Sequence, residues 1–160
     1  MKNFIDENFL RNKWKYISQS ILVTFFVGII LVFFDFVVKI VIAASLGATC
    51  FIIFTIPHKN ASKSKYILGG YAIGVVVGGL CAMASAVTPQ LPPSVWGAVA
   101  IGLTMFLMVL LNLEHPPACA LSLGFVLTGF NAGTVITVFC ITGFLLGVRR
   151  LLKNILIDLI

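Results

Sequence analysis

Long uncharged apolar runs, separated by short polar breaks, make up most of the chain. A bilayer core of about 30 Å requires about 17–25 apolar residues in a spanning helix. Five runs meet this length, and only one of them contains a charge, Lys39. They are residues 16–34, 36–57, 66–88, 95–113 and 132–148. The pattern therefore predicts an all-α integral membrane protein.

Residues 114–131 form a sixth segment whose apolar part, 118–130, is short for a crossing. The basic residues decide how it is placed, because cytoplasmic loops carry an excess of Lys and Arg. If the segment crosses, six spans result and only Lys39 lies outside. The residues that then lie inside are Lys2, Arg11, Lys13, Lys15, Lys59, Lys63, Lys65, Arg149, Arg150 and Lys153. This distribution predicts six transmembrane segments with both termini in the cytoplasm.

The sequence Glu114-His115-Pro116-Pro117 interrupts the fifth span. A helix over residues 116–130 covers about 22 Å at 1.5 Å per residue, and an extended stretch over 113–115 adds about 10 Å. We therefore predict a broken span that is first extended and then helical. Proline suits the first helical turn, where its missing N–H is not needed. The start of this helix is predicted to bind an anion through backbone N–H groups and the helix dipole.

The chain is expected to form one membrane domain with two short flanks. Residues 1–15 mix charged and apolar positions, which fits either a helix lying in the membrane interface or a frayed tail. Residues 16–152 form the six-span domain, and residues 153–160 form a cytoplasmic tail. Asp35 and Lys39 are four residues apart and can pair at one membrane face.

A short word recurs in the second and fifth spans, as Ser45-Leu46-Gly47 and Ser122-Leu123-Gly124. Three spans precede the turn at 89–94 and three follow it, so two copies would insert in opposite orientations, as in many secondary transporters. Substrates of such proteins bind where broken helices meet near the midplane. The match covers only three residues, so two inverted repeats with broken second and fifth spans and a chance match both stay open. The repeat would place substrate beside Ser45, Gly47, Ala48, Thr49, Ser122 and Gly124.

Glycines recur every four residues in two of the spans. The third span carries Gly70, Gly74 and Gly78, and the sixth carries Gly143 and Gly147. Such a stripe lets two helix backbones approach closely. The main interpretation is helix packing, within one subunit or between the subunits of a dimer or trimer. The alternative is a substrate path along the small face.

Glu114 and His115 are the leading polar candidates. Ionisable side chains at membrane depth are costly, which makes a functional role the default hypothesis. The two residues either line the substrate path or sit at its cytoplasmic mouth, where water removes the cost. His115 can carry a proton near neutral pH, so the pair could couple anion movement to protons. With Pro116 and Pro117 they are predicted to guard the cytoplasmic side, whereas His58 is expected in an interfacial loop.

The composition narrows the function further. The chain is 60% hydrophobic and 10% charged, and its net charge of +6 sits at the ends of apolar runs, which does not indicate a nucleic-acid partner. Cys50, Cys81, Cys119 and Cys140 form no C-x-x-C pair and are expected to be small buried hydrophobes. His115 and Cys119 lack a further ligand cluster, so no metal is predicted. The chain carries no catalytic motif, so neither an enzyme nor a cofactor is predicted.

Three stretches in order resemble the HPP family of integral membrane proteins. They are Ser45-Leu46-Gly47-Ala48-Thr49 running on to Pro57, then Gly69-Gly70, then His115-Pro116-Pro117-Ala118. The similarity extends over nearly the whole chain. The sequence departs from the family pattern at Cys119, at Tyr71 and in the lysine-rich loop before it. Plant chloroplast and cyanobacterial members are nitrite transporters, so the resemblance implies transport of a small inorganic anion, nitrite by default.

The predicted function is a carrier or channel for nitrite or a similar anion in the bacterial inner membrane. Its expected partners are the lipid bilayer, the anion, protons and further copies of the chain. The competing hypothesis is a non-transporting scaffold or assembly protein packed through its glycine stripes. A wet cavity lined by the two Ser-Leu-Gly words would count against the scaffold, and a sealed interior would favour it.

Overall fold

A computed structural model describes residues 7–34 and 40–159 of the chain, and within these ranges it is helical without strands. The elements are α1 (Glu7–Phe34), α2 (Ile40–Thr55), the short 3₁₀ helix η1 (Asn60–Ser62), α3 (Ser64–Val87), α4 (Pro93–Leu110), α5 (Pro117–Thr128) and α6 (Ala132–Leu152). The all-α prediction is therefore confirmed. The predicted pair between Asp35 and Lys39 lies outside the described residues.

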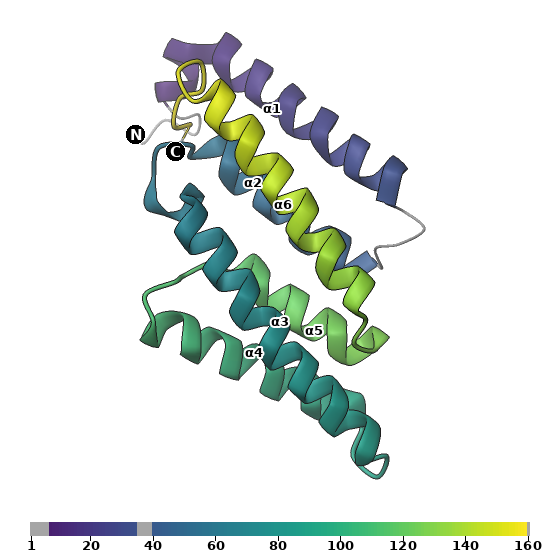
Figure 1. The fold of residues 1–160 in the computed structure, drawn as a ribbon. Helices are drawn as coiled ribbons and strands as arrows, with labels where there is room; N and C mark the ends of the chain where they lie inside the picture. The colour runs from purple at the N-terminus through teal and green to yellow at the C-terminus, as the bar shows by residue number, and fades with distance from the viewer. Residues whose placement is uncertain (1–6, 35–39, 160) are drawn as a thin grey trace.

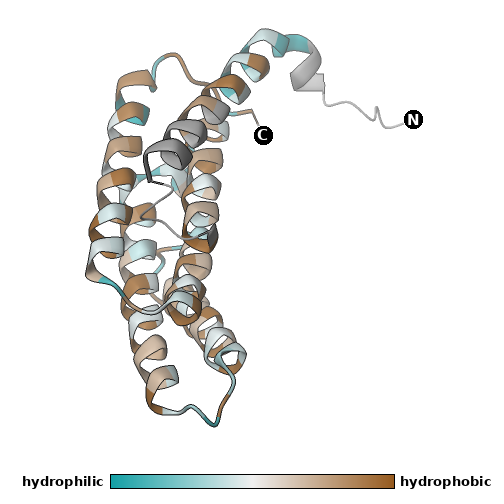
Figure 2. Ribbon diagram, turned by 90° about the vertical axis from the view of Figure 1, so that its right-hand side faces the viewer, coloured by the Kyte–Doolittle hydropathy of each residue, from teal (hydrophilic) through white to brown (hydrophobic). Residues whose placement is uncertain are grey.

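Three of the described helices are long and apolar enough to cross a membrane: α3, α4 and α6. α2 and α5 are equally apolar but shorter, with 16 and 12 residues. Most helical residues are apolar or near neutral in hydropathy (Figure 2), and many of the large apolar side chains are exposed. In α4, for example, Gly97, Ala100 and Thr104 face inward, whereas Phe106 and Leu110 are exposed. Small and polar residues inside with large apolar residues outside are what a lipid solvent requires. The number of crossings stays a prediction.

The short helix α5 lies at the centre of the bundle. It packs against α2, α3 and α4, and α2 in turn contacts α1 and α6 (Figure 1). More than half of α5 is buried: Pro117, Ala118, Leu121, Ser122, Gly124, Phe125 and Val126. α3 and α4 form a hairpin that extends beyond the other helices at the end opposite the termini (Figure 1). The segment that begins with the two prolines is therefore the most enclosed helix of the molecule's described part.

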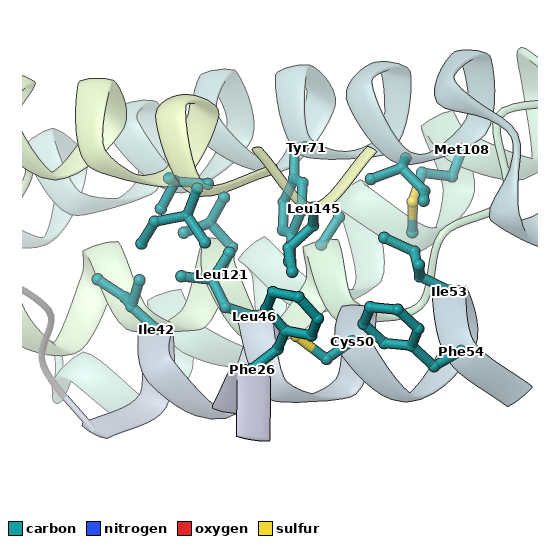
Figure 3. Close-up of a cluster of buried hydrophobic side chains, with 14 of the residues drawn as sticks. Phe26, Ile42, Leu46, Cys50, Ile53, Phe54, Tyr71, Met108, Leu121 and Leu145 are labelled. Atoms are coloured by element: carbon teal, nitrogen blue, oxygen red, sulfur yellow. The ribbon is translucent and has the colours of Figure 1, made fainter. Parts of the chain in front are cut away.

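A continuous apolar core joins all six α-helices, with Met108 as the contribution of α4. Figure 3 shows its side chains, among them Leu46, Leu121 and Leu145. The rings of Phe26 and Phe54 stack in it, with centroids 5.3 Å apart and planes inclined by 8°. Burial of such side chains stabilises a fold, although in lipid the gain comes from close packing rather than from leaving water.

The cysteines are not all inside this core. All four thiols are free. Cys50 and Cys81 are buried, Cys119 is partly buried, and Cys140 is exposed on α6. The expectation of four buried cysteines is therefore wrong for Cys140, because its face of α6 points away from the bundle.

α2 is continuous from Ile40 to Thr55 and runs through the first Ser-Leu-Gly word, so the second span has no break at this word. The flanking alanines are good helix formers, and a single glycine costs a helix only about 1 kcal/mol. Ser122-Leu123-Gly124 likewise lies inside the unbroken helix α5. Neither word is therefore a chain break, and two inverted repeats stay a prediction.

The start of α1, the α2–α3 connection and the C-terminal segment meet at one end of the molecule (Figure 1). The Gln19 side-chain amide donates to the carbonyls of Phe54 and Ile157, at 2.8 Å each. The backbone N–H of Leu159 donates to the Thr55 carbonyl at 2.7 Å. The three basic segments therefore share one end, as the charge pattern requires. Residues 155–159 are docked on α1 and α2 rather than forming a free tail.

The N-terminal flank is helical wherever it is described. α1 begins at Glu7 and is kinked at Asn12, where φ is −125° and ψ is 31°. Trp14 is 83% exposed just beyond the kink. A helix that changes direction at this point fits the interfacial alternative better than the frayed tail, over residues 7–15.

Candidate functional site

The break in the predicted fifth span is real, and it begins with a helix cap. Asn112 adopts φ of 52°, in the left-handed region, after the end of α4. The Leu113 N–H donates to the Met108 carbonyl at 2.9 Å, and the Asn112 N–H to the Val109 carbonyl at 3.2 Å. This is the hydrogen-bond pattern of a Schellman motif, which ends a helix firmly. The chain stays non-helical up to Pro116, and α5 starts at Pro117, as the prolines predicted.

The start of α5 does not offer the backbone anion site that we predicted. Pro116 and Pro117 have no N–H to donate. The next two N–H groups are already used: Ala118 donates to the His115 carbonyl at 2.9 Å and Cys119 to the Pro116 carbonyl at 3.0 Å. The positive end of the helix dipole remains, but its first turn has no free donor. An anion at this end would need a side-chain donor.

His115 is fully buried at the break, with 0% of its surface exposed. Its Nε2 lies 3.0 Å from Thr49 Oγ1 of α2. Its ring meets the Tyr71 ring of α3 edge-on, with centroids 4.9 Å apart and planes inclined by 73°. Gly70 makes room for this arrangement, because a Cβ there would lie 2.4 Å from His115 Cβ. The histidine is thus held between α2 and α3, away from an exposed mouth.

Three hydroxyl groups continue from His115 into the protein. Thr49 Oγ1 lies 2.6 Å from the Tyr71 hydroxyl. The Tyr71 hydroxyl also lies 3.2 Å from Ser45 Oγ. Ser45 in turn donates to the Pro117 carbonyl at 2.6 Å. Ser45 and Thr49 are four residues apart, so a continuous helix places both on one face of α2. We call Ser45, Thr49, Tyr71 and His115 the polar cluster.

The polar cluster is enclosed by apolar side chains and buried in all four members. Almost every polar atom in it has a partner, with one exception. His115 Nδ1 is buried and has no hydrogen-bond partner among the described residues. An unpaired buried polar atom costs about 1–3 kcal/mol. The fold alone therefore does not explain why this nitrogen is buried without a hydrogen bond.

A pocket of about 350 Å³ lies between α4 and the break. His115, Glu114, Pro116 and Cys119 line it on one side. Met105, Met108 and Val109 of α4 line it on the other. Its walls are mostly apolar, with Glu114 and His115 as the polar groups, which is the usual character of a small-molecule site.

The remaining predicted path residues do not join the polar cluster. Glu114 and Pro116 are exposed, as is Ala48 on the far face of α2 from Thr49, and Gly47 has open space around it. Ser122 is buried and donates to the Cys119 carbonyl at 2.9 Å.

Gly124 packs beside Ile42, since a Cβ at Gly124 would lie 2.8 Å from Ile42 Cγ1. Ser45 meets Pro117 near the start of α5, whereas Ile42 meets Gly124 further along it, so α2 and α5 run antiparallel.

Tyr71 is the member that the sequence reasoning missed. It was noted only as a departure from the HPP pattern. Its signal is its position, because Tyr16 and Tyr66 begin apolar runs whereas Tyr71 lies inside one. A polar side chain within a span is a functional candidate by default.

The second histidine of the chain lies away from the polar cluster, in the α2–α3 connection. His58 binds the C-terminal segment. Its backbone N–H donates to Asp158 Oδ1 at 2.9 Å, and its ring Nε2 lies 3.0 Å from the Leu156 carbonyl oxygen. Among the residues that the structure describes, no group of three or more His, Cys, Asp and Glu side chains could hold a metal ion.

The α3 glycine stripe packs directly on α5. A Cβ at Gly74 would lie 2.7 Å from the Ala118 carbonyl oxygen, and one at Gly78 would lie 2.7 Å from Ser122 Cα. Gly143 and Gly147 on α6 differ, because no atom of another described segment lies within 4 Å of a Cβ built at either position. The described part of the chain shows no close packing on these two glycines, and packing between subunits stays a prediction.

The comparison with known families agrees with this architecture. Residues 10–157 match the family described as HPP, transmembrane region. The chain belongs to this family. The match spans all six helices of the HPP protein, including the Pro116-Pro117 break and the polar cluster. No curated protein and no solved structure matches the HPP chain at a significant level.

Proposed function

We propose that this HPP protein moves a small inorganic anion across a lipid membrane, with nitrite as the first substrate to test. The observation that carries the proposal is His115. It is fully buried at a helix break, it borders a pocket, and one of its ring nitrogens has no partner. Broken helices that carry a polar group at membrane depth are typical of substrate sites in transporters.

The charge around the site supports an anion. Lys63 and Lys65 lie just before Gly69 and Gly70, the residues that touch the break. Clustered positive charge raises the local concentration of anions and speeds their entry. Glu114, exposed beside the pocket, opposes a bare anion. Movement together with a proton would relieve that repulsion, which makes protons a proposed coupling ion.

The proposed placement follows the charge pattern. The shared end of α1, the α2–α3 connection and the C-terminal segment faces the cytoplasm of a bacterial inner membrane, and all six helices contribute to spanning. The protein acts as a homo-oligomer.

A scaffold without transport activity is the second candidate. Two observations favour it. All four members of the polar cluster are buried, and Gly143 and Gly147 of α6 have no atom of another described segment within 4 Å of their Cβ positions. Flux measurements separate the two candidates.

The test is anion flux into proteoliposomes with nitrite, nitrate, formate and chloride, each with and without a pH gradient. We expect saturable nitrite uptake that falls about tenfold or more in His115→Ala, because a hydrogen bond to a charged group contributes about 1.5–3 kcal/mol. His58→Ala is the matched control and should keep parental uptake, since His58 binds the C-terminal segment. No anion flux above that of empty liposomes, from folded protein, would support the scaffold.

A further inference from the structure

The hydrogen-bond directions in the polar cluster can be worked out from its donors. Ser45 has one hydroxyl proton, and a carbonyl oxygen can only accept. The 2.6 Å contact with the Pro117 carbonyl therefore uses that proton. Ser45 Oγ is left as an acceptor only, and it cannot also donate to Tyr71.

The contact between Thr49 and Tyr71 is the next short one, at 2.6 Å. A phenol is a stronger donor and a weaker acceptor than an aliphatic hydroxyl. The Tyr71 hydroxyl also lies 3.1 Å from the Ser45 carbonyl, but Thr49 Oγ1 is the nearer acceptor, so we assign the Tyr71 proton to Thr49 Oγ1. The proton of Thr49 then has two acceptors within reach, His115 Nε2 at 3.0 Å and the Ser45 carbonyl at 3.2 Å. The imidazole nitrogen is nearer, and the carbonyl lies in the helical backbone, where it already has a role.

We propose that Thr49 donates to His115 Nε2, so that the neutral ring carries its proton on Nδ1 and offers this N–H to an oxygen of a small oxyanion in the neighbouring pocket. This inference rests on the proposed function and names the donor that the backbone of α5 does not supply. Tyr71 is then a positioning residue. It touches no substrate, and it sets the tautomer of His115 through Thr49.

The arrangement explains two features together. The unpaired Nδ1 is the donor kept free for the ligand, and the hydroxyl chain prevents the ring from presenting a bare nitrogen instead. A bare nitrogen would repel an anion, whereas an N–H attracts it. The tautomer of a histidine is commonly set in this way, by the bond that its other nitrogen makes.

The tautomer can be read directly by nitrogen-15 NMR of the full chain in lipid nanodiscs with labelled histidine. The chain has two histidines, so His58→Gln leaves His115 as the single signal. We expect a protonated Nδ1 and a bare Nε2, and a shift of the Nδ1 resonance when sodium nitrite is added. A protonated Nε2 in the parent would overturn the assignment, as would an Nδ1–H resonance that nitrite leaves unmoved.

Substitutions in the hydroxyl chain test its direction. In Tyr71→Phe, Thr49 gains a free acceptor position and can turn its proton to the Ser45 carbonyl, so the ring proton should move to Nε2. We expect nitrite binding to weaken about fivefold to tenfold in Tyr71→Phe and Thr49→Val, and to recover in Thr49→Ser. An unchanged tautomer in Tyr71→Phe would overturn the role of Tyr71.

Thr142→Val is the matched control for Thr49→Val. Thr142 is also buried, but its hydroxyl has no hydrogen-bond partner among the described residues. The tautomer and nitrite binding should not change in this variant. If nitrite shifts the Nδ1–H signal but the protein shows no anion flux, the binding site is supported and the transport proposal is contradicted. If the protein transports nitrite but His115 carries its proton on Nε2, the transport proposal is supported and the assigned tautomer is contradicted.

Discussion

Two glycine stripes with the same four-residue spacing have opposite surroundings in this molecule. The stripe of α3, Gly70, Gly74 and Gly78, is covered by the chain from His115 to Ser122, with backbone atoms under 3 Å from the places where Cβ atoms would be at Gly74 and Gly78. The stripe of α6, Gly143 and Gly147, has no atom of another described segment within 4 Å of its Cβ positions. Spacing alone therefore identifies a surface that can be approached closely, and not the partner that approaches it.

The difference follows from what lies opposite each stripe. α5 is a short helix whose polar start must be enclosed, and His115 can reach Thr49 only if α3 lets the break come close. Glycine at three successive turns of α3 provides that space. α6 packs its other face, Val138, Ile141 and Leu145, into the core and leaves its glycines outside.

Gly78→Ala should have a large effect on stability. Its Cβ would lie 2.7 Å from Ser122 Cα and 2.8 Å from the Ser122 carbonyl oxygen, and backbone atoms cannot turn aside as a side chain can. Overpacking of this kind costs about 1–3 kcal/mol. The measurement is thermal unfolding in detergent, with Gly143→Ala as the control. Equal losses in the two variants would contradict the contrast between the stripes.

Gly70→Ala should act on the site as well as on stability. The new methyl would displace His115, whose Cβ lies 2.4 Å from its position, and so lengthen the bond between Nε2 and Thr49. We expect a loss of nitrite flux of about tenfold, together with a loss of stability comparable to that in Gly78→Ala, because the His115 Cβ is fixed to the backbone and cannot turn aside. Gly69→Ala is the neighbouring control, because its Cβ would meet only the Leu113 side chain, which can move. A larger loss of flux in Gly69→Ala would show that His115 is not the sensitive element.

Much of the fold could be predicted from the sequence because membrane helices are encoded locally. Apolar run lengths identified the helices, and Pro116-Pro117 placed the start of α5 within one residue. The basic residues predicted a common end for three separate segments, which the contacts of Gln19 with α2 and with the C-terminal segment show.

The candidate site was harder to predict from the sequence than the fold, because it is formed by residues that lie far apart in the chain. Nothing local to Tyr71 indicates that its hydroxyl meets Thr49, 22 residues earlier. The predicted backbone anion site failed for a geometric reason, since the first N–H groups of α5 turn back to the carbonyls of His115 and Pro116. Gly47, Ala48 and Gly124 were included because they lie in matching words, and a helix distributes neighbouring residues over different faces.

The double substitution Gly143→Ala with Gly147→Ala should have the smallest effect on the fold of one chain. No atom of the described chain lies within 4 Å of either new methyl, and alanine favours a helix over glycine. We expect the unfolding temperature to match that of the parent, within the equivalent of about 0.5 kcal/mol. Light scattering on the same detergent samples reports the particle size, and so whether a second copy of the chain packs on the α6 stripe. A smaller particle than the parent, at an unchanged unfolding temperature, would show that the α6 stripe is filled by a second copy. A lower unfolding temperature with no change in particle size would contradict the open face of α6.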